Sequence, residues 1–261
     1  MKFGFIGTGN MGCAIIEGML KKYHPYDIIV TDKNKEVLRA VCGKYGTMSA
    51  ESNVEATNCD FLFLCVKPNV LFDVIDEIKE AITERTTVIS IVAGKSIKSI
   101  EEAFGKNIGI IRVMPNTPAL IGEGMSAICK NEYVSSENMD TVMDVFAGFG
   151  VAEEISETLM DVVTGVSGSS PAYVFMMIEA MADAAVLGGM PRDKAYIFAS
   201  QAVLGSAKMV LETKKHPGEL KDMVCSPGGT TIEAVAELEK TGFKSSIIEA
   251  IKKCVEKSKK L

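Results

Sequence analysis

The sequence predicts an α/β domain with a parallel sheet over residues 1–155 and an all-α domain over residues 156–261. In the first half, compact apolar segments alternate with segments of helical spacing, as in a parallel sheet that is covered by helices. A glycine-rich turn joins the first expected strand to the first expected helix. After residue 154, extended segments give way to helical ones rich in Met, Ala and Leu, which indicates a second domain.

The expected strands of the first half are short apolar runs. Continuous runs without polar alternation are typical of strands that are buried on both faces. Strands are expected over residues 2–7, 27–31, 61–66, 88–92, 108–114 and 125–129. Helices are expected over residues 11–22, 35–45 and 70–82. This alternation predicts a doubly wound sheet.

The second half contains a helix that is apolar on nearly every face. Ser169, Ser170 and Pro171 predict its start, because serine caps helices and proline fits a first helical turn. The segment 172–187 that follows must be covered on all sides, and another helix is expected over residues 193–211. A helical domain of this size has difficulty covering such a helix alone. We therefore expect an interlocked homodimer, with burial inside the chain's own domain as the alternative.

Composition and charge argue against several classes of protein. The net charge of −6 disfavours a general affinity for nucleic acid or for an anionic membrane. The continuous apolar runs are shorter than the roughly 18–20 residues that span a bilayer, and the N-terminus does not resemble a signal peptide. Seven cysteines without a CxxC pair suit reduced thiols in a cytoplasmic protein. With only two histidines, no metal site is expected.

Residues 7–12 form a G-x-G-x-x-G sequence between a strand and a helix, which is the context that dinucleotide binding requires. Gly7 permits a tight turn, Gly9 lets the backbone approach a pyrophosphate, and Gly12 allows the helix to pack closely on the strand. The pyrophosphate then lies against the free amides at the helix N-terminus. This context favours a Rossmann-like nucleotide domain over a chance glycine turn.

The choice between NAD and NADP stays open at the end of the second expected strand. Asp32 stands where an acid commonly accepts hydrogen bonds from the adenosine ribose and repels a 2′-phosphate, which favours NAD. Lys33, Asn34 and Lys35 share the same turn and would neutralise a phosphate if Asp32 points away from it. A solvated turn without a cofactor role is the remaining alternative.

Two further loops follow strand ends on the side where a dinucleotide is expected. The first is the segment Cys65–Pro68, in which Lys67 has little structural reason to follow a buried strand. The second is residues 91–94, whose small side chains leave room for a nicotinamide ring. Each could be ordinary turn chemistry, but both lie at carboxyl ends of strands, where ligands bind in open α/β sheets.

The helical half contains one stretch that is unlike ordinary helix sequence. Residues 216–222 are followed by residues 225–231, which place a proline, two glycines and two threonines directly before a helix expected near Ile232. Exposed backbone amides and hydroxyls at a helix N-terminus make a good site for a carboxylate. A capped helix start is the alternative, and it explains one threonine but not the pair Gly228 and Gly229.

These motifs also carry a resemblance to a known family. The chain resembles the pyrroline-5-carboxylate reductases from end to end, in the family's order. The motifs that carry the resemblance are residues 7–12, 66–68, 114–118, 166–173 and 226–231. The resemblance implies a Rossmann domain, a helical domain that forms dimers, and dimers that assemble into decamers. It also implies an enzyme of the cytoplasm that reduces 1-pyrroline-5-carboxylate to L-proline with NADPH or NADH, the last step of proline biosynthesis.

The resemblance assigns roles to individual residues. It places the Thr231 hydroxyl near the ring nitrogen as the catalytic group, and the Gly229 and Thr230 amides at the substrate carboxylate. It places Glu157 near the substrate, which the partner subunit helps to bind. The implied cofactor positions, together with those expected from the motifs, are Ile6, Gly7, Thr8, Gly9, Asn10, Met11, Gly12, Asp32, Lys33, Asn34, Asn53, Cys65, Val66, Lys67, Pro68, Val92, Ala93 and Gly94.

Two departures from the family pattern and two rival functions complete the sequence-based expectations. Ser170 replaces a glycine that is usual in the family, and Asp32 replaces the small polar residues of many NADP-preferring members. One rival is another two-domain imine or 3-hydroxyacid oxidoreductase, although residues 166–173 lack the lysine that such dehydrogenases place there. The other is a non-catalytic NAD-binding protein, which has no reason to keep residues 226–231.

Overall fold

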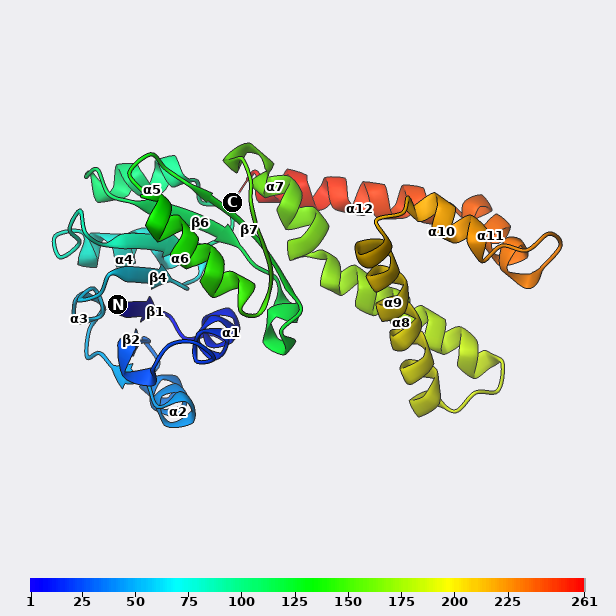
Figure 1. Ribbon diagram of the computed structural model, residues 1–261, viewed down its shortest axis with the longest axis horizontal. Helices are drawn as coiled ribbons and strands as arrows, with labels where there is room; N and C mark the ends of the chain where they lie inside the picture. The colour runs from blue at the N-terminus through cyan, green and yellow to red at the C-terminus, as the bar shows by residue number, and fades with distance from the viewer. Residues whose placement is uncertain (261) are drawn as a thin grey trace. The chain divides into compact units, whose positions relative to one another are not determined.

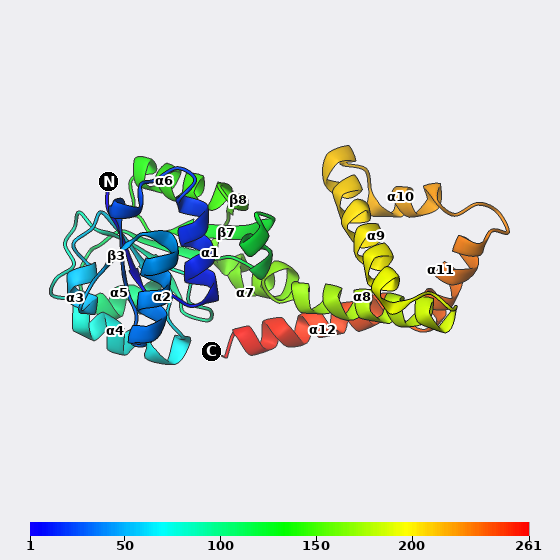
Figure 2. The same ribbon diagram turned by 90° about the horizontal axis from the view of Figure 1, so that it is seen from below.

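The computed structural model describes residues 1–260. The chain separates into two compact units. The first contains Met1–Ser169 together with the C-terminal residues from Cys254 onward, and the second contains Ser170–Lys253. The sequence-based boundary at residues 155 and 156 falls directly after the last strand, β8 (Gly150–Glu154). Figure 1 and Figure 2 show the strands within the first unit and only helices within the second.

The first unit is built on an eight-stranded sheet with the order β3-β2-β1-β4-β5-β6-β7-β8. Every neighbouring pair is parallel except β6 with β7. The strands are β1 (Phe3–Ile6), β2 (Ile28–Thr31), β3 (Met48–Ser49), β4 (Phe61–Leu64), β5 (Thr87–Ser90), β6 (Ile110–Met114), β7 (Gly124–Lys130) and β8 (Gly150–Glu154). This topology confirms the predicted Rossmann-like α/β domain with a mostly parallel sheet.

The antiparallel pair β6 and β7 departs from an all-parallel sheet. Only the short 3₁₀ segment η3 (Thr117–Ile121) connects the two strands. A parallel pair needs a crossover of a dozen or more residues, usually a helix, and this connection is too short for one. The two strands therefore run in opposite directions, with Arg112 opposite Cys129.

Helices cover both faces of the sheet, and each face has its own apolar core (Figure 2). The helices α1 (Asn10–Met19), α2 (Lys35–Tyr45) and α6 (Ser136–Ala147) pack on the face that contains Phe3 and Phe5. The helices α3 (Asn53–Ala56), α4 (Leu71–Ile78) and α5 (Ile97–Phe104) pack on the face that contains Leu62 and Leu64. Side chains alternate between the two faces along each strand, so both faces of a central strand are buried. The remaining short segments are η1 (Pro25–Asp27), η2 (Pro68–Val70), η4 (Glu157–Leu159) and α7 (Met160–Val163).

The second unit consists of helices with little buried surface of their own. Its helices are α8 (Ser170–Leu187), α9 (Arg192–Thr213), α10 (Pro217–Met223), α11 (Thr230–Lys240) and α12 (Phe243–Ser258), the last of which ends in the first unit. Large apolar side chains are exposed along α8 and α9, including Phe175 (63%), Leu187 (91%) and Phe198 (64%). Apolar surface of this kind marks an interaction site. The burial of α8 within its own domain, the alternative to dimerisation, is therefore not observed in this chain.

The start of α8 differs from the expectation. Residues 164–168 form a π-helical turn directly before α8, and Ser169 has helical backbone angles (φ −99°, ψ −19°) rather than the extended angles of a capping residue. The helix therefore continues from the preceding residues instead of beginning at a serine cap. π-helical turns of this kind are frequently found at functional sites.

Asn116 compensates for the proline in this helix. Pro171 has no backbone N–H, so it cannot pair with the carbonyl of Ser167, four residues earlier. The Asn116 side chain donates to that carbonyl oxygen at 3.0 Å, and its own oxygen accepts from the Met125 amide at 2.8 Å. Asn116 is 8% exposed, so this bridge is a buried tie between the sheet and the π-helical turn.

One helical stretch, Glu157–Leu187, is long and apolar enough to cross a membrane by length and composition. From the sequence, no segment is expected to be long enough, because that expectation counts only continuous apolar runs. This stretch of 31 residues qualifies because a few charged residues within it are allowed. Only 6% of its most apolar window is buried within the chain. The core helices of soluble proteins meet the same criterion, so a single helix of this kind is weak evidence for a membrane protein.

Candidate active site

The glycine turn after β1 has the geometry that its sequence predicts. Gly7 has a φ of +96°, and a Cβ at this position would lie 2.5 Å from the Cys65 carbonyl oxygen. A Cβ at Gly12 would lie 2.7 Å from the Gly7 carbonyl oxygen, so close packing of α1 on the turn requires glycine there. A Cβ at Gly9 would meet nothing within 4 Å. Gly9 therefore borders open space, and its lack of a side chain is not needed for the fold.

The N-terminus of α1 is suited to an anion. Gly9 is its N-cap residue, no side chain caps the helix, and the first turn contains no acidic residue. By contrast, Asn34 caps α2 and Ser96 caps α5 with side-chain oxygens. The first amides of a helix lack partners within the helix, and the helix dipole adds positive potential. The residues of this turn therefore fit the diphosphate of a dinucleotide, with Gly9 as the point of close approach.

Asp32 points toward the glycine turn. Its Oδ2 accepts hydrogen bonds from the Thr8 amide at 2.8 Å and from the Thr8 hydroxyl at 3.0 Å. Its Oδ1 accepts from the Asn34 amide at 2.8 Å. Both Asp32 oxygens are thus directed at protein donors of the glycine turn and of the turn that follows β2. Lys35 donates to the Glu51 carbonyl oxygen at 3.2 Å.

The other predicted cofactor loops lie at the same edge of the sheet. Gly7 packs against Cys65 and Val66 at the end of β4, and the Ile91 amide after β5 donates to the Leu64 carbonyl oxygen at 3.3 Å. The ends of β1, β2, β4 and β5 are thus adjacent. Ile6 and Val92 are buried, whereas Lys33, Lys67, Asn10 and Gly9 are exposed and the remaining positions of these loops are mostly half-buried.

Two predicted cofactor residues make contacts that hold the fold. The side-chain amide of Asn53 donates to Glu77 of α4 at 2.6 Å. The Asn34 side-chain oxygen accepts from the Glu36 and Val37 amides and caps α2. Each can contribute to a cofactor site only with its remaining atoms, since these side-chain groups already have partners.

The second unit contains a similar helix start at Gly229. Gly229 is the N-cap of α11, again without a side-chain cap, and α11 begins at Thr230, two residues before the expected position. Gly228 has a φ of +67°, which favours glycine, and a Cβ at Gly229 would lie 2.3 Å from the Ser226 hydroxyl. Both glycines are thus favoured by the turn, and the amides of Thr230 and Thr231 lie in the first turn of α11. This geometry fits a carboxylate.

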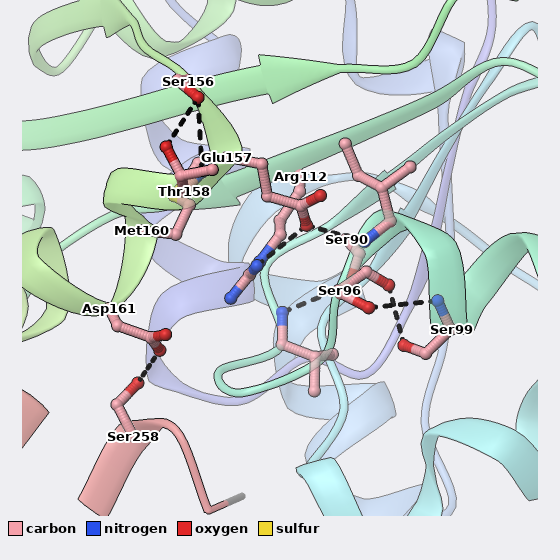
Figure 3. Close-up of polar contacts among 12 residues, drawn as sticks. Ser90, Ser96, Ser99, Arg112, Ser156, Glu157, Thr158, Met160, Asp161 and Ser258 are labelled. Atoms are coloured by element: carbon pink, nitrogen blue, oxygen red, sulfur yellow. Dashed lines mark hydrogen bonds and ion pairs between the residues drawn. The ribbon is translucent and has the colours of Figure 1, made fainter. Parts of the chain in front are cut away.

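Glu157 has partners that the sequence does not reveal. Its Oε1 accepts from the Arg112 guanidinium at 2.9 Å and from the Ile97 amide at 2.7 Å (Figure 3). Arg112 is only 6% exposed. Arg112 is not among the site residues expected from the sequence, although an arginine inside the apolar run 110–114 is itself a signal of a specific buried partner.

Comparisons with known proteins decide between the candidate families. Residues 157–261 match the family model described as pyrroline-5-carboxylate reductase dimerisation, and residues 2–94 match the model described as NADP oxidoreductase, coenzyme F420-dependent. The chain is 52% identical over 263 aligned positions to a pyrroline-5-carboxylate reductase of Escherichia coli, with 100% of this chain and 98% of the relative covered. The chain belongs to the pyrroline-5-carboxylate reductase family.

Solved structures of the family agree with this assignment. A pyrroline-5-carboxylate reductase of Coxiella burnetii is 33% identical with a TM-score of 0.92, and the match covers 99% of this chain and 97% of that one. The pyrroline carboxylate reductase of Plasmodium falciparum, solved with NADP bound, is 34% identical with a TM-score of 0.89, and the coverage is 99% and 97%. The resemblance inferred from the motifs is thus confirmed. The family's dimerisation region coincides with the exposed apolar helices, which supports homo-oligomerisation.

Proposed function

We propose that this chain reduces 1-pyrroline-5-carboxylate to L-proline with a hydride from NADPH or NADH. The full-length match to the family carries this proposal, and two helix starts support it. In α1 the glycine cap leaves amides for a diphosphate, and in α11 it leaves amides for a carboxylate. A non-catalytic nucleotide-binding protein does not require both helix starts, because it has no use for the second.

The first unit is the proposed coenzyme domain. Gly7–Gly12 would hold the diphosphate at the N-terminus of α1. Asp32 would accept a hydrogen bond from the adenosine ribose with the remaining capacity of Oδ1. The loops Cys65–Pro68 and 92–94 would line the part of the coenzyme site that holds the nicotinamide. The remaining predicted positions, at the edge of the coenzyme site, are Ile6, Lys33, Asn34 and Asn53. When it is bound, the reduced nicotinamide supplies a hydride.

The proposed substrate and dimerisation domain is residues 156–261, which include the whole second unit, Ser170–Lys253. The Thr230 amide would hold the substrate carboxylate, and the Thr231 hydroxyl would hydrogen-bond the ring nitrogen. The Gly229 amide, which the resemblance also assigns to the carboxylate, donates to the Ser226 carbonyl oxygen at 3.0 Å and would have to leave it or share its proton. A protonated imine carbon is already electrophilic, so the residues contribute mainly orientation, which supplies roughly 7–11 kcal/mol in favourable cases. The imine carbon accepts the hydride, and the ring nitrogen carries one hydrogen in the product amine. If the imine arrives neutral, the Thr231 hydroxyl donates that proton and is reprotonated from water.

The chain is proposed to work as a homodimer in the cytoplasm, with dimers assembled into a decamer. The exposed apolar side chains of α8 and α9 support an interlocked dimer, since a second copy would cover them. All seven cysteines are free thiols, which suits a reducing compartment. Sedimentation velocity would give the assembly, with a monomer as the result that contradicts the proposal.

A direct spectrophotometric assay tests the function. Purified protein is given 1-pyrroline-5-carboxylate with NADPH or NADH, the near-ultraviolet absorbance of the reduced nicotinamide is followed, and proline is identified by chiral chromatography. We expect loss of absorbance with equal formation of L-proline. If the protein oxidised the reduced coenzyme with the keto form of a 3-hydroxyacid as substrate but not with the imine, the rival dehydrogenase function would be favoured.

A further inference from the structure

The buried arginine of β6 depends on one carboxylate. Arg112 donates to Glu157 Oε1, and the side chains are 7% and 31% exposed. The Arg112 Nε is buried without a hydrogen-bond partner in the part of the chain that the structure describes. A buried charge is costly unless it is paired, and an underpaired guanidinium makes its remaining partner more important. Glu157 is therefore held in one place by Arg112.

The same oxygen of Glu157 also binds the start of a helix. Ile97 is the first residue of α5, and its amide donates to Glu157 Oε1 at 2.7 Å. The Ser96 hydroxyl accepts from the Ser99 amide at 3.1 Å, so two side chains together satisfy amides of the first turn. Figure 3 shows the Glu157 carboxylate between Arg112 and the beginning of α5, near Ser96 and Ser99. A carboxylate is stabilised at this position by the helix dipole.

Glu157 thereby fixes one end of a proposed coenzyme loop. Strand β5 ends at Ser90 and α5 begins at Ile97, so residues 91–96 connect them. At the strand end, the Val92 amide donates to the Ser90 hydroxyl at 3.3 Å. At the helix end, the connection is held by the contact of Ile97 with Glu157. Residues 92–94 are the segment proposed to line the nicotinamide.

We propose that Glu157 and Arg112 are positioning residues for the coenzyme, which act through residues 92–94 and do not touch the substrate. This inference rests on the proposed function. The contacts of the Glu157 carboxylate with Arg112 and Ile97 both use Oε1, and they tie η4, β6 and α5 together. The role differs from the direct substrate contact that the family resemblance implies.

The test is a comparison of coenzyme and substrate binding in Glu157→Gln. Glutamine keeps the size of the side chain and an oxygen for the Ile97 amide, but it removes the charge that faces Arg112. We expect the Kd and KM of NADPH or NADH to rise roughly tenfold or more, the equivalent of about one charge-assisted hydrogen bond, while the KM of the imine changes less than about twofold. Glu153→Gln, an exposed acid on β8, is the matched control and should leave both values unchanged. A selective rise in the imine KM would overturn the proposal.

A double variant separates positioning from stability. Arg112→Met with Glu157→Gln removes both charges, and it should restore folding if Glu157→Gln alone unfolds the protein. We expect a melting temperature near that of the wild type with a coenzyme Kd that stays elevated. A coenzyme Kd that returns to the wild-type value would show that the pair acts only through stability, and would sink the proposal. Coenzyme titration without imine gives this result even if the wild type does not reduce the imine.

Discussion

Replacement of Gly9 by alanine should weaken coenzyme binding while the fold remains intact. A Cβ at Gly9 would meet no atom within 4 Å, and the backbone angles of φ −70° and ψ −173° are allowed for alanine. Alanine is a poorer N-cap than glycine, so the free energy of unfolding should fall by about 0.5–1 kcal/mol. The added methyl group would occupy the space through which a diphosphate approaches the amides of α1. Loss of one charge-assisted hydrogen bond costs about 1.5–3 kcal/mol, which is about a ten- to hundredfold rise in Kd.

The assay measures stability and binding on the same samples. Thermal unfolding gives stability, and the fluorescence of the reduced nicotinamide gives Kd without interference from tryptophan, which this chain lacks. Gly43→Ala is the matched control, because Gly43 lies inside α2 with nothing within 4 Å of its Cβ. It should stabilise the protein by about 1 kcal/mol and leave Kd unchanged. A folded Gly9→Ala variant with wild-type coenzyme affinity would refute the proposed place of the diphosphate.

Three further predictions concern the substrate, the coenzyme and the thiols. Thr231→Ala should lower kcat by roughly tenfold to a hundredfold with an unchanged coenzyme Kd. Thr231→Ser should retain most activity, because only the hydroxyl is needed. Steady-state kinetics measure the kcat of both variants. Asp32→Asn should raise the ratio of kcat/KM for NADPH to that for NADH by about tenfold, because it removes a like charge near the 2′-phosphate, whereas Asp27→Asn at the other end of β2 should not change it. Burial raises the pKa of the Cys59 and Cys129 thiols to about 12, so both should resist alkylation in the folded protein and react after unfolding, as mass spectrometry would show.

Each of these predictions has a clear contrary result. Wild-type turnover in Thr231→Ala would remove its hydroxyl from the mechanism, and an unchanged coenzyme ratio in Asp32→Asn would remove Asp32 from coenzyme selection. Because the folded pKa of Cys129 lies above its unfolded value, the thiol's contribution to stability is present below pH of about 9 and is lost toward a pH of about 12. Rapid alkylation of Cys129 in the folded protein would contradict its burial.

Local cap signals predict only some of the helices that carry them, since α5 and α6 each follow a serine cap and neither is among the expected helices. The helix expected over residues 35–45 has these bounds in the structure, because Asn34 caps its start and Gly46 ends it with a φ of +71°. The helix α5 was not predicted, although Ser96 and Gly105 provide the same signals, since its eight residues are too few for a convincing apolar period. The edge strand β8 was also missed, because its exposed residues do not form an apolar run.

Long-range contacts account for what the sequence did not predict. The direction of β7 cannot be predicted from its apolar run, because the same run fits a parallel or an antiparallel strand. The need for glycine at positions 7 and 12 follows from the absence of a Cβ and could be predicted locally. The contact of Arg112 with Glu157 joins residues 45 positions apart, so no local pattern identifies the pair. The orientation of Asp32 depends in the same way on Thr8, which lies 24 positions away.

Isotope transfer tests the central claim most directly. The protein is supplied with reduced coenzyme that carries deuterium at the transferred position of the nicotinamide, together with unlabelled 1-pyrroline-5-carboxylate. We predict L-proline with a single deuterium on the carbon that was doubly bonded to nitrogen, and loss of this product in the Gly9→Ala and Thr231→Ala variants in proportion to their lower rates. Proline without deuterium, or oxidised coenzyme without proline, would contradict the account.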